Sequence, residues 1–169
     1  MMRALRLLLV ALLLATTACG WRLRGMGESF SLEGIALYLN AGSVNPELTV
    51  PLERSLQASG AELVAEPQLA DAVLTLLGES TRQRAASISA DARVQEYELL
   101  YTLRFRLSSA AGEVLIDDEE LQLAEIYQYD SGNVLGTQSR AAGVLERLRR
   151  DAVRMLLPRL QATLRPLQQ

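Results

Sequence analysis

The feature that most constrains the fold is a long stretch of strict alternation in the second half of the chain. Its apolar members are Tyr97, Leu99, Tyr101, Leu103, Phe105 and Leu107. The positions between them hold mostly polar or charged residues, namely Glu98, Thr102, Arg104, Arg106 and Ser108. Because successive side chains of a β-strand point to opposite faces of a sheet, this period of two predicts a half-buried antiparallel strand.

The segments around this strand predict the rest of a small sheet. After a turn at 109–112 the chain continues as a strand over 113–129, which makes a hairpin. Upstream, the alternation over 35–40 and the apolar run 72–77 predict two further strands. The polar stretch 79–89 is a candidate continuation of the second of these, so four strands are expected in all.

Two helices are predicted from apolar side chains at three- and four-residue spacing. The first begins near Thr49, has Pro51 in its first turn and ends before Gly60. The second covers about 138–164, and Pro158 is expected to bend or shorten it. On its solvent side we expect three arginines, Arg147, Arg150 and Arg154.

The order of these elements, β-α-β-β-β-α, predicts an α+β fold built as a two-layer sandwich. A four-stranded mixed sheet would carry both helices on its apolar face. The strand–helix–strand beginning favours a right-handed crossover between parallel strands. We expect a single domain over 34–169, because the chain is too short for two cores and contains no linker or repeat.

The N-terminal segment has the composition of an export signal. Two arginines precede an apolar run over 7–15, and small residues follow as far as Ala18. The only cysteine of the chain, Cys19, comes next. This pattern is typical of a bacterial lipoprotein, in which residues 1–18 are removed and the cysteine thiol receives a diacylglycerol. Residues 19–33 would then form a lipidated tether that leads into the fold.

Two alternatives stay open for this segment: an uncleaved membrane anchor, or an ordinary signal peptide followed by a chance cysteine. The apolar run is short for a bilayer, which needs about 20 apolar residues. The residue after the cysteine is Gly20, rather than the aspartate that often retains lipoproteins at the inner membrane. We therefore expect a lipid anchor at the outer membrane, on its periplasmic side.

Two absent residue types exclude most catalytic chemistry. The chain contains no histidine, which rules out Ser-His-Asp and Cys-His catalysis and every histidine-based metal site. All 17 basic residues are arginines, so neither a lysine Schiff base nor a lysine general base can form. We expect no enzymatic activity, no cofactor and no metal site.

The net charge argues against one class of partner. The whole chain carries −3, and removal of the signal with its two arginines takes this to about −5. Proteins that bind nucleic acids usually present a basic surface instead. No nucleic-acid partner is therefore expected.

Two charged clusters are candidate sites. The acidic run 117–120 could serve acid–base chemistry or bind calcium. Neighbouring strand residues point to opposite faces, so we expect a solvated cluster that protects a sheet edge. Arg82, Arg84 and Arg93 flank the polar stretch 85–92. These arginines form either an anion-binding rim or part of a flexible, solvated hairpin tip, and the residues alone favour the tip.

Three stretches resemble the lipopolysaccharide-assembly lipoprotein family, LptE, and the resemblance extends over essentially the whole chain after the signal. Residues 19–25 read Cys-Gly-Trp-Arg-Leu-Arg-Gly, which is similar to the family's C-G-[FW]-x-L-R opening. The second stretch, 96–99, opens the alternating strand, and the third is the loop at Tyr129 and Asp130 before the last helix. The tyrosines of that loop suit either core packing or contact with a partner.

The resemblance implies a non-enzymatic protein in the lumen of the outer-membrane β-barrel LptD. Such proteins plug the barrel, assist its assembly and contact lipopolysaccharide during its insertion into the outer leaflet. The family's basic contacts with lipopolysaccharide correspond here to 90–93 and to the region of Thr137, with Arg140 nearby. The arginines we expect to bind lipopolysaccharide are Arg93 first, with Arg82 and Arg84 in support.

A second function stays open beside this one. The chain could be a periplasmic, lipid-anchored structural or solute-binding module unrelated to lipopolysaccharide. The two functions differ in their partners, because a detergent-stable complex with a large β-barrel is expected only from the first.

Overall fold

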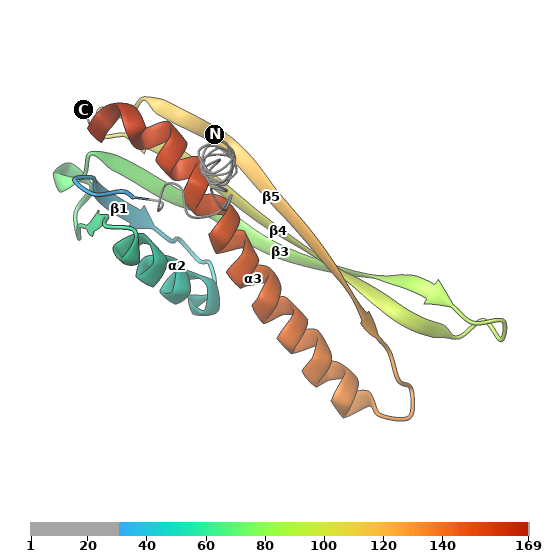
Figure 1. Ribbon diagram of the computed structural model, residues 1–169. Coiled ribbons are helices and arrows are strands. Elements are labelled where there is room, and N and C mark those ends of the chain that lie inside the picture. The colour runs from blue at the N-terminus through green and yellow to red at the C-terminus, as the bar shows by residue number, and fades with distance from the viewer. Residues whose placement is uncertain (1–30, 169) are drawn as a thin grey trace, which may run out of the picture.

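The computed structural model describes residues 31–168, which form one mixed β-sheet with two α-helices on the same face (Figure 1). The strands are β1 (Ala36–Asn40), β2 (Glu62–Leu63), β3 (Ala72–Ile88), β4 (Val94–Ser109) and β5 (Val114–Gln128). The helices are α2 (Pro46–Ala58) and α3 (Val134–Leu164), with short 3-10 helices η1 (Pro67–Leu69) and η2 (Arg165–Gln168). This confirms the predicted two-layer α+β fold.

The sheet has five strands, in the order β2-β1-β3-β4-β5, instead of the four predicted from the sequence. β1 runs parallel to β2 and β3, whereas β3, β4 and β5 are joined by antiparallel hairpins. The additional strand, β2, consists of two residues that pair with Ala36 and Leu37. An alternating pattern cannot be recognised over two residues, so the sequence contains no signal for this strand.

β3 continues through the polar stretch 79–88 and forms a long hairpin with β4. A register shift between Leu76 and Gly78 inserts one extra residue into β3. Beyond the shift Glu79 lies opposite Leu103, so from Glu79 to Ala85 the odd-numbered residues of β3 are on the sheet face that carries the helices. The bulge therefore exchanges the two faces of the strand.

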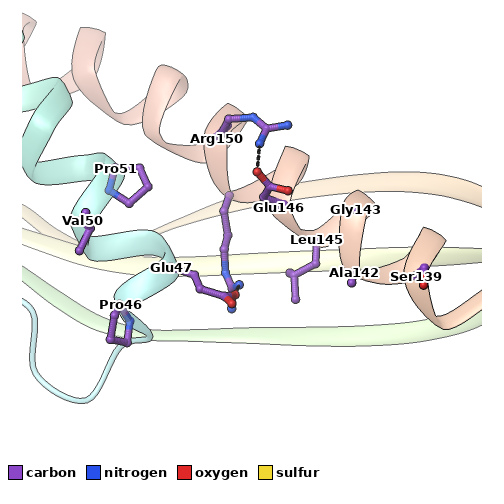
Figure 2. Close-up of a pocket in the computed structure, with 11 residues that line it drawn as sticks. Pro46, Glu47, Val50, Pro51, Ser139, Ala142, Gly143, Leu145, Glu146 and Arg150 are labelled. Carbon is purple, nitrogen blue, oxygen red and sulfur yellow. Dashed lines mark hydrogen bonds and ion pairs between the residues drawn. The ribbon is translucent and has the colours of Figure 1, made fainter.

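Both α-helices begin earlier than predicted, because an asparagine caps each of them. The side chain of Asn45 accepts a hydrogen bond from the amide of Glu47 at 2.9 Å, which starts α2 ahead of Thr49. Asn133 caps α3 in the same way, accepting from the amide of Gly136 at 2.9 Å. The N-terminal end of α2 faces the middle of α3 (Figure 2).

α3 continues past Pro158 to Leu164, so of the two expected effects of this proline the shortening does not occur. A proline inside a helix costs about 3 kcal/mol, because it removes one backbone hydrogen bond and crowds the preceding turn. Leu156, Leu160 and Leu164 have no exposed surface. Burying one such side chain contributes about 1.5–3 kcal/mol, so the three together outweigh the cost of the proline.

The beginning of the described chain packs closely against the end of α2. The amide of Leu32 donates to the carbonyl of Ser59 at 2.6 Å, and the Leu32 side chain is buried in the core although it belongs to the stretch 19–33 expected to be a tether. Gly60 follows with φ +89°, and a Cβ there would lie 2.6 Å from Cγ of Glu33. Both the left-handed backbone and the close approach require glycine.

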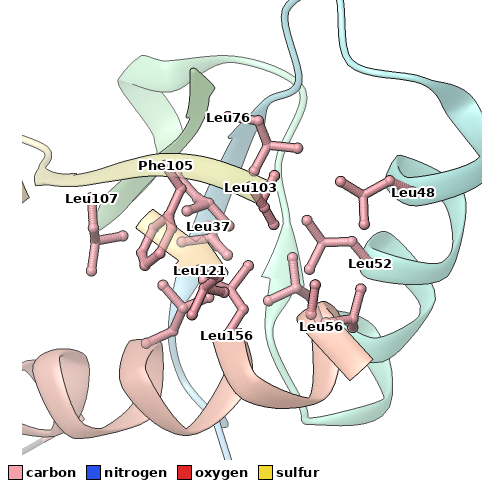
Figure 3. Close-up of a cluster of buried hydrophobic side chains, with 14 of the residues drawn as sticks. Leu37, Leu48, Leu52, Leu56, Leu76, Leu103, Phe105, Leu107, Leu121 and Leu156 are labelled. Atoms are coloured by element: carbon pink, nitrogen blue, oxygen red, sulfur yellow. The ribbon is translucent and has the colours of Figure 1, made fainter. Parts of the chain in front are cut away.

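The core lies between the helices and the face of the sheet that they cover (Figure 3). Five of the six alternating apolar residues of β4 are buried, and Tyr97 is partly buried. Their partners come from both helices and include Leu48, Leu52, Leu56, Leu148 and Leu156. The alternation over β4 therefore marks the centre of the core, as the sequence predicts.

Replacing Leu103 with alanine should lower the free energy of unfolding by about 2–5 kcal/mol, because this side chain has no exposed surface. Urea unfolding of the two proteins measures the difference. The control is Leu69→Ala on η1, where the side chain is 65% exposed and a change within about 0.5 kcal/mol is expected. A loss below about 0.5 kcal/mol for Leu103→Ala would contradict its place in the core.

Candidate functional site

The β3–β4 hairpin carries the candidate arginines toward one end of the molecule (Figure 1). Its turn is closed by two hydrogen bonds: the amide of Ser89 donates to the carbonyl of Arg93 at 2.8 Å, and the amide of Arg93 donates to Oγ of Ser89 at 3.2 Å. Ala92 has a positive φ of 58°, which tightens the turn. The side chain of Arg93 is thus exposed at the tip of an ordered hairpin.

Arg82 and Arg84 lie further down β3, on the sheet face turned away from the helices. In the register with β4 they stand opposite Leu100 and Glu98. The Nε of Arg84 donates to the Glu98 carboxylate, and this hydrogen bond raises the pKa of Arg84. Within residues 31–168, neither Arg82 nor Arg93 forms an ion pair. One hairpin therefore carries all three arginines, and two of them are uncompensated.

The loop before α3 is held by its own polar side chains. Oγ1 of Thr137, a residue only 6% exposed, accepts from the amide of Asp130 at 3.2 Å and donates to the carbonyl of Asn133 at 3.1 Å. The carboxylate of Asp130 accepts from the amide of Gly132 at 2.9 Å. Arg140 is exposed, and its Nη2 lies 3.5 Å from Oγ1 of Thr137. Of these two residues, Thr137 is thus structural and Arg140 is available to a ligand.

Three tyrosines pack together where β5 leads into this loop. The ring of Tyr97 meets that of Tyr129 edge-to-face at 5.2 Å between centroids, and the ring of Tyr127 at 6.1 Å. Tyr127 is buried, and burial raises the pKa of its hydroxyl. A shallow cavity of about 340 Å³ adjoins it, bordered also by Arg140 and Arg147. The cluster is mainly a packing feature, with one basic edge.

The β3–β4 turn and the β5–α3 loop lie at the same end of the molecule, where they point in different directions (Figure 1). The two regions that the family resemblance marks for lipopolysaccharide contact therefore belong to one end of the protein. A ligand touching both would have to bridge two separate projections.

A buried charge cluster joins α3 to the sheet, and it was not among the predicted sites. Arg149 is 6% exposed, and its Nη2 and Nε donate to the two carboxylate oxygens of Glu79 at 2.7 and 3.3 Å. The same guanidinium pairs with Glu47 at the start of α2. The hydroxyl of Tyr101 donates to Glu79 at 2.9 Å. One arginine thus connects α2, α3 and β3.

The position of Arg149 in this cluster could be recognised from the sequence, whereas that of Glu79 could not. Arg149 stands at helical spacing from Leu145 and Ala152, inside the apolar stripe of α3, where a charge must find a buried partner. Glu79 faces the helices only because the extra residue at Leu77 shifts the strand. The arginine could have been singled out by its position, but its partner could not.

Tyr101 should make the protein less stable at high pH. Burial, reinforced by the hydrogen bond to Glu79, raises the pKa of Tyr101 far above the ordinary 10.0. The unfolded chain therefore loses this proton above pH 10 while the folded chain keeps it. The stabilisation is complete below that pH and is lost as pH rises above it, by about 1.4 kcal/mol at roughly pH 11.

Urea unfolding of wild type and Tyr101→Phe at pH 9 and roughly pH 11 tests this linkage. The phenylalanine variant lacks the titrating group, so its stability should fall less between the two pH values. The exposed tyrosines of the unfolded chain contribute equally to both proteins. An equal loss of unfolding free energy between the two pH values in both proteins would contradict the raised pKa of Tyr101.

The acidic run 117–120 lies on β5, an edge strand of the sheet. The run contains a β-bulge, where β5 has one residue more than the facing part of β4 and Asp118 has a φ of +35°. This bulge lets Asp118 bind Arg104 and Asp117 bind Arg106, so both carboxylates reach arginines of one face. The expectation that neighbours in this run point to opposite faces is therefore wrong for Asp117 and Asp118, whereas Glu119 pairs with Arg159 of α3 on the other face. Among the described residues, no acidic or cysteine side chains gather as a metal site.

The comparisons with known proteins point to one family. A family model described as LptE, lipopolysaccharide-assembly, matches residues 35–160. Comparison with curated protein sequences finds no match. None of the helices within residues 31–168 combines the length and apolar composition needed to cross a membrane.

Several solved structures share the fold. A lipoprotein B from Nitrosomonas europaea, determined by NMR, aligns with a TM-score of 0.68 and 23% identity over 85% of this chain and 91% of that one. The rare lipoprotein B from Shewanella oneidensis aligns with a TM-score of 0.69 and 21% identity, over 79% of this chain and 99% of that one. A minor lipoprotein from Acinetobacter baumannii aligns with a TM-score of 0.62 and 20% identity, over 75% of this chain and 90% of that one. At these identities the likeness shows the architecture alone.

Proposed function

Since this chain belongs to the LptE family of lipopolysaccharide-assembly proteins, we propose that it serves this assembly as the partner of an outer-membrane β-barrel, LptD. In this proposal it plugs the barrel lumen, helps the barrel to assemble and binds lipopolysaccharide during its insertion. Cys19 carries the lipid that anchors it to the periplasmic side of the outer membrane. The family is non-enzymatic, so the function depends on surfaces rather than on a catalytic centre.

The observation that carries the barrel proposal is the sheet face turned away from the helices. Its charges are arranged as cross-strand ion pairs, which are Arg84–Glu98, Arg104–Asp118 and Arg106–Asp117. The interior of an outer-membrane barrel is polar and hydrated. A protein that fills it needs a polar surface whose charges already balance, because an unpaired charge held against the barrel wall would lose its hydration. Apart from Arg82, the arginines of this face meet that requirement.

Purification of LptD from outer membranes in mild detergent tests the partnership. We expect this chain to remain bound to the barrel in a constant ratio through gel filtration. A barrel that purifies without the chain would favour the lipid-anchored module unrelated to lipopolysaccharide. Because the readout is the complex itself, the result does not depend on whether the chain also binds lipopolysaccharide.

The lipopolysaccharide proposal is supported by the uncompensated arginines of the β3–β4 hairpin. Lipid A presents phosphate groups, and a guanidinium binds a phosphate through two charge-assisted hydrogen bonds worth about 1.5–3 kcal/mol. Arg93 at the tip is the first candidate and Arg82 the second, whereas Arg84 is already engaged by Glu98. Since the chain is acidic overall, any attraction to anions is local and not a general property of its surface.

Replacing Arg82, Arg84 and Arg93 together with alanine should weaken lipopolysaccharide binding at least about tenfold, the equivalent of one lost charge-assisted contact. Some binding should persist, because acyl chains add apolar contacts. Titration of the purified chain 19–169 with lipopolysaccharide measures the affinity. The charge-matched control replaces three exposed arginines of α3, namely Arg147, Arg150 and Arg154. Equal losses would reveal a nonspecific charge effect, and no loss would exclude the hairpin.

A further inference from the structure

A groove of about 830 Å³ separates the start of α2 from the middle of α3 (Figure 2). Its walls are largely apolar and come from Pro46, Val50, Pro51, Ala142, Gly143 and Leu145. Val50 retains 40% of its surface exposed there, in contrast to the fully buried Leu48 and Leu52 beside it. The described residues thus present an open, mainly apolar surface of a size that fits a few side chains.

Two exposed carboxylates stand at the rim of this groove. The side chains of Glu47 and Glu146 are each 71% exposed. Arg149 is divided between Glu47 and Glu79, and Arg150 pairs with Glu146. Glu79 does not line the groove, and its bidentate hold on Arg149 leaves the exposed carboxylate of Glu47 only partly neutralised at the rim. The groove suits a ligand that places apolar groups inside and cationic groups at the edge.

We infer that this groove binds the N-terminal segment 21–24 of the same chain, which reads Trp-Arg-Leu-Arg. In an extended conformation Trp21 and Leu23 point to one side and Arg22 and Arg24 to the other. The two apolar side chains enter the groove, and the two arginines meet the exposed carboxylates of Glu47 and Glu146 at its rim. The inference concerns contacts within one chain, so it holds or fails independently of binding to lipopolysaccharide or to the barrel.

The connecting residues have the right length. The hydrogen bond between Leu32 and Ser59 places the start of the described chain at the C-terminal end of α2. The helix has 13 residues and is therefore about 20 Å long, with the groove at its other end. Residues 25–31 span about 23 Å when extended. The segment 21–24 can thus reach the groove without disturbing the packing of Leu32.

Docking of this segment also fixes the orientation of the domain. Cys19 precedes Trp21 by two residues, so a lipid on Cys19 would be held beside the groove instead of at the end of a long tether. The α2–α3 side of the domain would then lie nearest to the lipid anchor. The opposite sheet face, with its paired charges, would lie farthest from it.

Trp21 is the only tryptophan of the chain, so its fluorescence reports directly on this segment. The protein to measure is the chain 19–169 with Cys19→Ser, which removes any contribution from an attached lipid. We expect a shorter emission wavelength and weaker quenching by acrylamide than in the isolated peptide 19–30. Emission and quenching equal to those of the peptide would overturn the inference.

A matched pair of substitutions locates the contact. Val50→Asp in the groove should raise the quenching of Trp21 to the level of the peptide. Val114→Asp, at a valine that is 50% exposed and does not line the groove, should leave the quenching unchanged. Equal effects of the two variants would overturn the inference. So would protection of Trp21 that disappears on dilution, because the segment would then occupy a second copy.

A disulfide provides a readout that misfolding cannot imitate. In the Cys19→Ser background, the pair Leu23→Cys and Val50→Cys should form an intramolecular disulfide under mild oxidation. The pair Leu23→Cys and Val114→Cys should remain reduced under the same conditions. Mass spectrometry of the oxidised proteins distinguishes the two pairs. Failure of the first pair to form the bond, or equal formation in both, would overturn the inference.

Discussion

Arg149→Met is expected to lower the free energy of unfolding by about 3–5 kcal/mol, the usual result of removing one partner from a buried ion pair. The substitution keeps a long apolar side chain but leaves the carboxylate of Glu79, with 15% of its side chain exposed, without its cation. It also frees Glu47 from α3, so the contact between the two helices weakens. Urea unfolding at neutral pH measures the loss.

Two further variants identify the cause of that loss. Arg154→Met changes an arginine of the same helix whose side chain is 76% exposed, and it should alter stability by no more than about 0.5 kcal/mol. Adding Glu79→Gln to Arg149→Met should restore part of the stability, because it removes the uncompensated charge. If Arg149→Met behaves like Arg154→Met, the buried cluster does not stabilise the fold.

Cys19→Ala is expected to remove the protein from the membrane fraction altogether. Each buried methylene contributes about 0.8 kcal/mol to membrane binding, so two or more acyl chains on one residue give an almost permanent anchor. Without the thiol no diacylglycerol can be attached, and the described domain has no helix able to cross a membrane. Cell fractionation with detection of the protein in each fraction measures the effect.

A control in the same segment separates lipidation from general damage to the signal. Thr16→Leu leaves the cysteine in place and supplies the leucine that many lipoprotein signals have three residues before it, so the protein should stay in the membrane. Intact-mass measurement of the wild-type protein should show the added mass of the acyl chains on Cys19. A wild-type protein without that mass would contradict the lipid anchor.

The sequence predicted those parts of the structure that depend on neighbouring residues. β4 was recognised because its side chains alternate strictly, and burial of Leu103 and Phe105 confirms the face assigned to them. α2 and α3 were recognised because leucines recur at helical spacing. Both helices were predicted to begin too late because the capping roles of Asn45 and Asn133 were not recognised, although asparagine is a common N-cap residue.

The candidate site was predicted only in part, because the face that a strand residue occupies depends on bulges that the sequence does not reveal. The sequence placed Arg93 at the end of a hairpin, and the structure puts it at the tip. Which face of the sheet Arg82 and Arg84 occupy depends on the bulge at Leu77, because a single inserted residue reverses the side chains that follow it as far as the next register shift. The pairing of Arg84 with Glu98 follows from that register.

By itself the sequence determined the order of the elements, the faces of β4 and the absence of histidine and lysine chemistry, because periodicity and composition are local properties of a chain. Only the tertiary structure decided the remaining features. The Arg149–Glu79 pair joins residues on α3 and β3, and β2 is a strand of two residues. The groove between α2 and α3 exists only because two distant helices pack together. Such features depend on which segments meet in space, and a local pattern carries no information about that.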